Sequence, residues 1–184
     1  AKGLSVARVH TGDPSMYGAI REQMVALDKE GIEYEVIPGV SSVFAGAAAL
    51  KREFTLPGVT QTMILTRMAG RTPVPESESI ENLAKIQASM AIFLSIASID
   101  ELAKKLMTSY PKDTPAAVVY KASWPDQKII VSTLECIADK VKEADINKMA
   151  LVYVGRFLAD EFELSKLYDK HFSHEFREAK DARR

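Results

Sequence analysis

The chain has 184 residues, of which 24 are basic and 25 acidic, and its formal net charge is −1. At roughly 100–200 residues per domain, this length allows one full domain or two small ones. The balanced charge gives no overall field that would attract nucleic acid or an anionic membrane surface. Hydrophobic residues make up 47% of the chain, the share expected of a folded soluble domain with its own core.

Four further absences narrow the class of protein. The one cysteine, Cys136, allows no intrachain disulfide and no cysteine-based zinc cluster, and we expect it to be a small buried residue on a helix. His171 and His174 lie three residues apart without a carboxylate-rich partner segment, so no metal site is expected. Apolar stretches such as Met90–Leu94 fall far short of the roughly 18 residues that a membrane span needs. No signal peptide is recognisable, which favours a cytoplasmic protein without membrane or nucleic-acid partners.

The first 50 residues carry the alternating pattern of a parallel α/β sheet. Val6–Val9 predicts a short buried strand, and Ser15 is the expected N-cap of a helix that Gly31 closes. Alternation over 32–36 predicts a second strand, and a second helix follows at 43–50, capped by Ser41 or Ser42. Two parallel strands cannot form a stable sheet alone. We therefore expect strands to be missing before Ala1, which is also not a starting methionine.

The rest of the chain predicts a complete α/β domain. Pro57-Gly58 marks the expected boundary, which divides the chain into 1–57, the later part of a first domain, and 58–184, a second domain. The tail from Asp160 is expected to be partly helical and packed. A long loop at 68–79 is a candidate functional segment. The expected strands are 60–67, 90–94, 115–120, 128–131 and 149–154, and the expected helices are 79–87, 99–108 and 133–143.

Two loops in the first 50 residues are suited to ligand binding. Thr11-Gly12-Asp13-Pro14 follows the first predicted strand, and ligands of open α/β sheets bind beyond the carboxyl ends of strands. Gly12 allows a ligand to approach the backbone, Asp13 supplies a fixed negative charge, and the next helix begins with free N–H groups. Pro38–Ser42 follows the second strand in the same way. Both loops would line one crevice, although such a loop taken alone is more often just a turn.

Basic residues form a second group with two interpretations. Arginine side chains suit bidentate binding of carboxylates, so the group would hold a polycarboxylate if the fold gathers it around a cleft. The alternative is a solvated surface. The group comprises Lys51, Arg52, Arg67, Arg71 and Lys121. The sequence contains neither a dinucleotide-binding glycine turn nor a phosphate loop, and no residue stands out as a general base.

Four blocks of the sequence resemble those of a known family. They read VHTGDPSMYGAIREQM, VIPGVSSVFAGAAAL, LPGVTQTMILTRMAGRTPVPE and VVYKASWPDQKII. They are similar to blocks of the precorrin-4 and cobalt-precorrin-4 C11-methyltransferases, within the tetrapyrrole (corrin/porphyrin) methylase family. The resemblance runs over nearly the whole chain. The Gly-Asp-Pro and Pro-Gly-Val-Ser blocks are shared by the methylases in general, whereas GRTPVPE and YKASWPD are typical of the C11 enzymes.

The resemblance implies a fold and a set of ligands. It implies two α/β domains with S-adenosylmethionine in the cleft between them, a homodimer, and a corrin-precursor tetrapyrrole as substrate. Where Leu94 and Ala122 stand, related methylases often carry Met and Gly. Our candidates to bind the substrate carboxylates are Arg67, Arg71 and Lys121. On the family pattern, the donor would touch Thr11, Gly12, Asp13, Met16, Ser41, Ser42, Leu94 and Ala122.

The activity that the resemblance implies is methyl transfer from S-adenosylmethionine to C11 of precorrin-4 or cobalt-precorrin-4 in cobalamin biosynthesis. Two alternatives stay open. One is another tetrapyrrole methylase with a different substrate. The other is a catalytically silent fragment with an incomplete first domain, because the family's N-terminal strand and its Gly-x-Gly-Pro-Gly-Asp loop are not found in this sequence.

Overall fold

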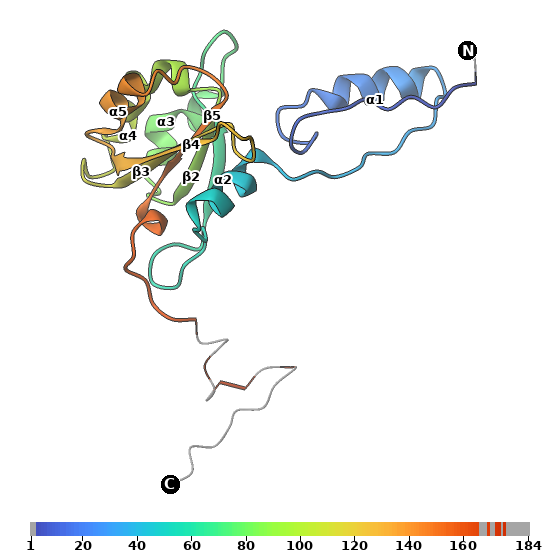
Figure 1. Cartoon of the computed structure of the whole chain (residues 1–184). Coiled ribbons are helices and arrows are strands. Elements are labelled where there is room, and N and C mark those ends of the chain that lie inside the picture. The colour runs from blue at the N-terminus through green and yellow to red at the C-terminus, as the bar shows by residue number, and fades with distance from the viewer. Residues whose placement is uncertain (1–2, 166–168, 170–171, 174, 176–184) are drawn as a thin grey trace.

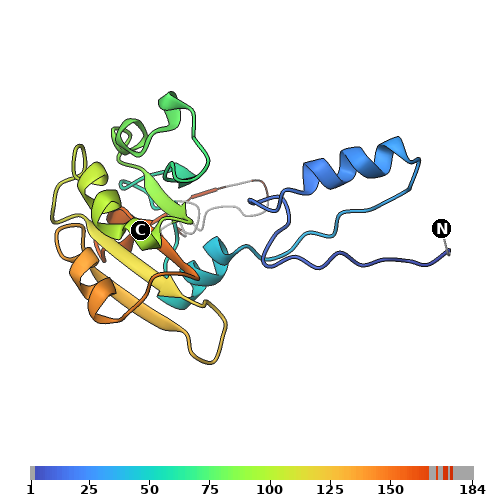
Figure 2. The same ribbon diagram turned by 90° about the horizontal axis from the view of Figure 1, so that it is seen from above.

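The computed structural model describes residues 3–165, 169, 172–173 and 175. Residues 41–159, here called the body, are built around one β-sheet. Residues 3–40, here called the arm, extend away from the body and contain α1 (Ile20–Lys29), flanked by two extended segments (Figure 1). Figure 2, turned by 90°, shows the same separation of α1 from the sheet.

Five strands form the sheet, in the order β1-β2-β5-β3-β4. β1 and β2 are parallel, β5 is antiparallel to both β2 and β3, and β4 is antiparallel to β3. It follows that β1, β2 and β3 run in one direction and end at the same edge of the sheet. The strands are β1 (Met63–Arg67), β2 (Ser89–Phe93), β3 (Pro115–Tyr120), β4 (Lys128–Thr133) and β5 (Ala150–Val154).

Helices cover both faces of this sheet. One face is packed against α3 (Ile80–Ala84), α4 (Ile99–Leu106) and α5 (Ile137–Glu143). The other face carries α2 (Ser42–Leu50), together with Phe54 and Phe157. Side chains of a strand alternate between the two faces. In β5, Val152 and Val154 therefore enter the first core and Tyr153 enters the second.

The five strands and three helices predicted for residues 58–159 are confirmed, with bounds that differ by a few residues. One local prediction there is wrong. Cys136 is exposed, because α5 begins at Ile137 and leaves the cysteine at its N-cap instead of on the inner face of a helix. The domain boundary at 57 stays a prediction, and α2 and Phe54 on its N-terminal side pack on the sheet.

The two strands predicted in the arm are wrong. Residues 6–9 and 32–36 are extended but form no ladder, and the Val6 side chain is 88% exposed. A strand exists through hydrogen bonds to a neighbouring strand. No described residue supplies such a neighbour to either segment. Their β-branched residues thus keep an extended conformation without the burial that the pattern predicted.

The helix of the arm begins later than predicted. Ser15 is not its N-cap, because the chain turns through left-handed Tyr17 and Ala19 before α1 starts at Ile20. Its end is as predicted. Gly31 has φ +65°, its N–H donates to the Asp28 carbonyl at 3.2 Å, and Ile32 N–H donates to Leu27 at 3.0 Å. That pair of bonds is a Schellman motif, which favours glycine.

Two remaining predictions concern the N-cap of α2 and the tail that begins at Asp160. Ser41 is the N-cap of α2, as predicted, and its hydroxyl accepts a hydrogen bond from Val43 N–H. In the tail, residues 161–165 contain no helix. His171 and His174 lie outside the described residues.

Candidate functional site

The site is built at the edge of the sheet where β1, β2 and β3 end, here called the site edge. Arg67 and Phe93, the last residues of β1 and β2, are paired across the ladder. Leu94 follows at once with φ 53° and a side chain that is 76% exposed, and Lys121 follows β3 with φ 46°. Non-glycine residues in this left-handed region are uncommon and cluster at functional sites. The topology thus brings the predicted donor residues Leu94 and Ala122 to one edge.

The two predicted ligand loops, residues 11–14 and 38–42, lie against each other. Gly12 has φ +67°, and a Cβ built there would lie 3.4 Å from the Cα of Ser41. A Cβ on Gly39 would lie 2.1 Å from the Gly12 carbonyl oxygen, which no packing tolerates. Close approach of the two backbones therefore requires glycine at position 39.

Asp13 holds the two loops together. Its Oδ2 accepts a hydrogen bond from Gly39 N–H at 3.0 Å, and its Oδ1 accepts from the Ser15 N–H at 2.9 Å and from the Ser15 hydroxyl. The Ser15 hydroxyl, followed by the N–H groups of Gly39 and Ser15, holds the pKa of the Asp13 carboxyl below its usual value. The carboxylate is thus ionised at neutral pH, and its three hydrogen bonds fix the conformation of the two loops.

Tyr17 connects these loops to the site edge. Its ring meets Phe93 with centroids 5.1 Å apart and planes inclined by 63°, an edge-to-face contact. Burial raises the pKa of the Tyr17 phenol, the positive charge of Arg67 lowers it, and the negative charge of Glu78 raises it. The charges of Arg67 and Glu78 therefore both act on this side chain. Sequence reasoning missed Tyr17 because the predicted helix that follows Ser15 included this position, and no spacing pattern marked the residue.

The predicted substrate-binding cations have different partners. Arg67 donates to the carbonyls of Met68, Thr72 and Pro73 at 3.3, 3.1 and 2.8 Å, and so shapes the start of the long loop. Arg71, exposed within that loop, forms no ion pair or hydrogen bond with the part of the chain that the structure describes. Arg52 pairs with Asp160 at 2.8 Å. That pair lies beyond the end of β5, at the opposite edge of the sheet.

Lys121 lies at the site edge but is already engaged in an ion pair. Its ammonium group pairs with Asp126 and lies 5.1 Å from the Tyr120 ring and 5.5 Å from the Trp124 ring. The hydrogen bond to Asp126 is the main cause that raises the pKa of Lys121. Lys121 thus stays charged, and an anionic ligand would have to compete with Asp126 for it.

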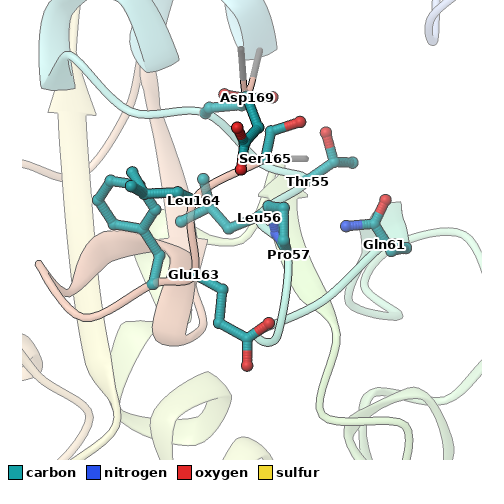
Figure 3. Close-up of a pocket in the computed structure, with 10 residues that line it drawn as sticks. Thr55, Leu56, Pro57, Gln61, Glu163, Leu164, Ser165 and Asp169 are labelled. Carbon is teal, nitrogen blue, oxygen red and sulfur yellow. The ribbon is translucent and has the colours of Figure 1, made fainter. Parts of the chain in front are cut away.

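Cavities add a further constraint on the site. Near the start of β1, residues 53–61 and the described part of the tail enclose about 640 Å³ (Figure 3). Three carboxylates line it, Glu53, Glu163 and Asp169, and they would repel a polycarboxylate. A second cavity, of about 530 Å³, lies in the arm between α1 and the extended segments and reaches Gly12 and Gly39. The arm cavity, and not the acidic one, adjoins the predicted donor loops.

The described residues contain no group of three or more histidine, cysteine, aspartate or glutamate side chains that would hold a metal ion. Within the same residues, no helix has both the length and the apolar character to cross a membrane.

Replacing Asp13 by asparagine tests the tie between the loops. Asparagine has one acceptor oxygen where the carboxylate uses two, so it cannot accept from both Ser15 N–H and Gly39 N–H. We therefore expect binding of an adenosyl ligand at the loops to weaken roughly three- to tenfold at neutral pH. The pKa of Asp13 in the folded chain is below its usual value. The hydrogen bonds to its carboxylate are therefore fully present above about pH 4, and they are lost as the pH falls through the lowered pKa of Asp13. Calorimetric titration at neutral pH measures the effect. Asp113→Asn, at an exposed turn, is the matched control, and equal affinities for the two variants would contradict the assigned tie.

Comparison with known proteins gives consistent similarities. Residues 1–138 match the family model for tetrapyrrole (corrin/porphyrin) methylases. The cobalt-precorrin-4 C(11)-methyltransferase of Methanocaldococcus jannaschii is 54% identical over 180 residues, which cover 97% of this chain and 70% of that protein. The precorrin-4 C(11)-methyltransferase of Pseudomonas aeruginosa is 48% identical and is covered to 71% of its length.

A solved structure agrees with these sequence similarities. The cobalamin biosynthetic enzyme cobalt precorrin-4 methyltransferase superimposes with a TM-score of 0.80 at 50% identity. The match covers 82% of this chain and 64% of that chain. The present chain thus spans about two thirds of the length of these proteins.

Proposed function

The chain belongs to the tetrapyrrole (corrin/porphyrin) methylase family, and on this premise we propose that it transfers a methyl group from S-adenosylmethionine to C11 of precorrin-4 or cobalt-precorrin-4. This reaction is a step of cobalamin biosynthesis. The observation that carries the proposal is the 54% identity with the M. jannaschii enzyme over 97% of the chain. The shared fold, with a TM-score of 0.80 to a cobalt precorrin-4 methyltransferase, supports it.

The residues at the two loops suit an adenosyl donor. Thr11, Gly12 and Ser42 are exposed, and each has a small polar side chain or none. The Tyr17–Phe93 contact joins the first loop to the end of β2, which the left-handed Leu94 follows. S-adenosylmethionine supplies an already activated methyl group, so the task of the protein is to align donor and acceptor. The loops hold the donor, and the site edge excludes water on one side. Neither step requires a charged catalytic side chain.

Arg71 is our candidate for direct contact with the substrate. A corrin precursor carries acetate and propionate groups, and a guanidinium binds carboxylates in a bidentate manner. Arg67 is engaged with three carbonyls and Lys121 with Asp126, which leaves Arg71 available in the same loop region. We infer that Arg67 shapes the loop, that Arg71 contacts the substrate, and that Lys121 contributes positive charge behind the Trp124 ring.

Substitution of Arg71 by alanine is expected to raise KM for the tetrapyrrole roughly three- to tenfold and to leave kcat nearly unchanged. Loss of an exposed ion pair weakens binding of substrate and transition state equally. Steady-state kinetics with varied tetrapyrrole checks this. Lys104→Ala, which removes an exposed cation on α4, is the control and should leave KM unchanged. A fall in kcat at constant KM would contradict the assignment.

Two experiments separate the proposal from its alternatives. Calorimetric titration with S-adenosylhomocysteine distinguishes a methyltransferase from a catalytically silent chain that has the fold but does not bind the donor. Product analysis after incubation with precorrin-4, cobalt-precorrin-4 and uroporphyrinogen III then identifies the substrate. We expect methylation of precorrin-4 or its cobalt complex and none of uroporphyrinogen III. The reverse preference would replace the C11 assignment with another tetrapyrrole methylase.

We also propose that the protein acts as a homodimer, as the family resemblance implies, and in the cytoplasm, as expected from a sequence in which no signal peptide is recognisable. The balanced net charge of −1 is compatible with association of identical surfaces. Light scattering on the purified chain tests the assembly, and a mass of one chain across the micromolar range would contradict it.

A further inference from the structure

Tyr17 occupies a position that the predicted site did not include. The chain folds back tightly before it: Met16 N–H donates to the Asp13 carbonyl at 3.2 Å, and a Cβ on Gly18 would lie 2.1 Å from the Pro14 carbonyl oxygen. Tyr17 itself has φ 57°. A tyrosine in the left-handed region is strained, and such strain persists where surrounding contacts determine the conformation.

The contact that matches this strain is the one with Phe93. The two rings meet edge to face at 5.1 Å, although Tyr17 belongs to the arm and Phe93 ends β2 in the body. Phe93 is paired with Arg67 and is followed by the exposed Leu94. The contact therefore spans from the first donor loop to the site edge.

Asp13 and Tyr17 act at opposite ends of the same short turn. Asp13 binds Gly39 and so fixes the first loop to the second loop. Tyr17, four residues later, fixes the first loop to the end of β2. The separation between the Thr11–Met16 loop and Leu94 depends on the second of these contacts.

We propose that Tyr17 is a positioning residue that sets the width of the donor site by packing on Phe93. The proposal rests on the proposed function, because the width matters only if the adenosyl donor lies between this loop and Leu94. The ring, and not the hydroxyl, carries the role, since no described residue forms a hydrogen bond with the Tyr17 hydroxyl. Half of the Tyr17 side chain stays exposed, at 47%, so the fold of the body does not require it.

Titration of the full chain with S-adenosylhomocysteine tests the proposal. Tyr17→Ala is expected to weaken binding about three- to tenfold, which is the fold-change that the energy of an aromatic pair corresponds to. Tyr17→Phe keeps the ring and should bind like the unsubstituted chain. The control is Val25→Ala, which removes a partly exposed apolar side chain of α1 that does not line the arm cavity. The thermal unfolding midpoint should be equal for all of these chains.

A double-mutant cycle with Phe93→Leu makes the test specific. If the two rings act together, the loss in the double variant is smaller than the product of the two single losses. Unchanged binding by Tyr17→Ala, equal weakening by Val25→Ala, or independent effects in the cycle would each overturn the role of Tyr17. Absence of binding by the unsubstituted chain would instead overturn the proposed function, and this inference with it.

Discussion

Replacing Gly46 by alanine is expected to destabilise the body by about 2 kcal/mol, because the added methyl group overpacks the core. This loss is expected although alanine is more favourable than glycine in a helix by about 1 kcal/mol. A Cβ at this position of α2 would lie 1.9 Å from the hydroxyl of Tyr153, which is fully buried in β5. That hydroxyl donates to the carbonyls of Ser42 and Val43 at 2.9 and 3.0 Å. The methyl group therefore either displaces the tyrosine or lifts α2 from the sheet.

Denaturant unfolding measures this loss. Gly70→Ala is the matched control, because a Cβ there has no atom within 4 Å and the variant should unfold like the parent chain. Tyr153→Phe alone should lose about 1 kcal/mol with its hydrogen bonds. In the double variant the clashing oxygen is gone, so the combined loss should be less than the sum. Additive losses would contradict the packing of Gly46 on the tyrosine.

Substitution of Gly39 by alanine is expected to lower donor affinity roughly 10- to 100-fold, the loss that corresponds to a hydrogen bond to a charged group of roughly 1.5–3 kcal/mol. The added Cβ would meet the Gly12 carbonyl oxygen at 2.1 Å, and a backbone oxygen cannot step aside as a flexible side chain can. The loops must separate, and the bond between Gly39 N–H and Asp13 breaks with them.

Calorimetric titration with S-adenosylhomocysteine checks this prediction. Gly70→Ala again serves as the control, since it adds the same methyl group to an exposed loop with open space. The unfolding midpoint of the body should change little, because both loops precede the packed part of α2. Donor binding equal to that of the control would mean that the ligand does not lie between these loops.

Local patterns were sufficient for most of the body. The strands at 115–120 and 128–131 were predicted from two apolar runs, and they pair as a hairpin whose register joins Tyr120 to Lys128. Such a hairpin is determined by neighbours in sequence. The position of β5 was not predictable in this way. β5, which follows the other four strands in the chain, inserts between β2 and β3. Its position depends on how all the helices pack on the two faces of the sheet, and no local pattern encodes that.

The arm shows where such patterns fail. The alternation at 32–36 is as regular as that of a true strand, but pairing requires a partner, and none of the described residues provides it. In the candidate site, the sequence predicted that two glycine loops would meet, and they do. It did not predict that Asp13 ties them together or that Arg67 is engaged with loop carbonyls, because both depend on distances across turns.

Transfer of an isotopically labelled methyl group tests the central claim most directly. The full chain is incubated with S-adenosylmethionine labelled at its methyl carbon and with precorrin-4 or cobalt-precorrin-4, and the product is analysed by NMR. The account predicts one labelled methyl group, bonded to C11 of the macrocycle. A label on another ring carbon, or an unlabelled macrocycle from a chain that binds S-adenosylhomocysteine, would contradict it.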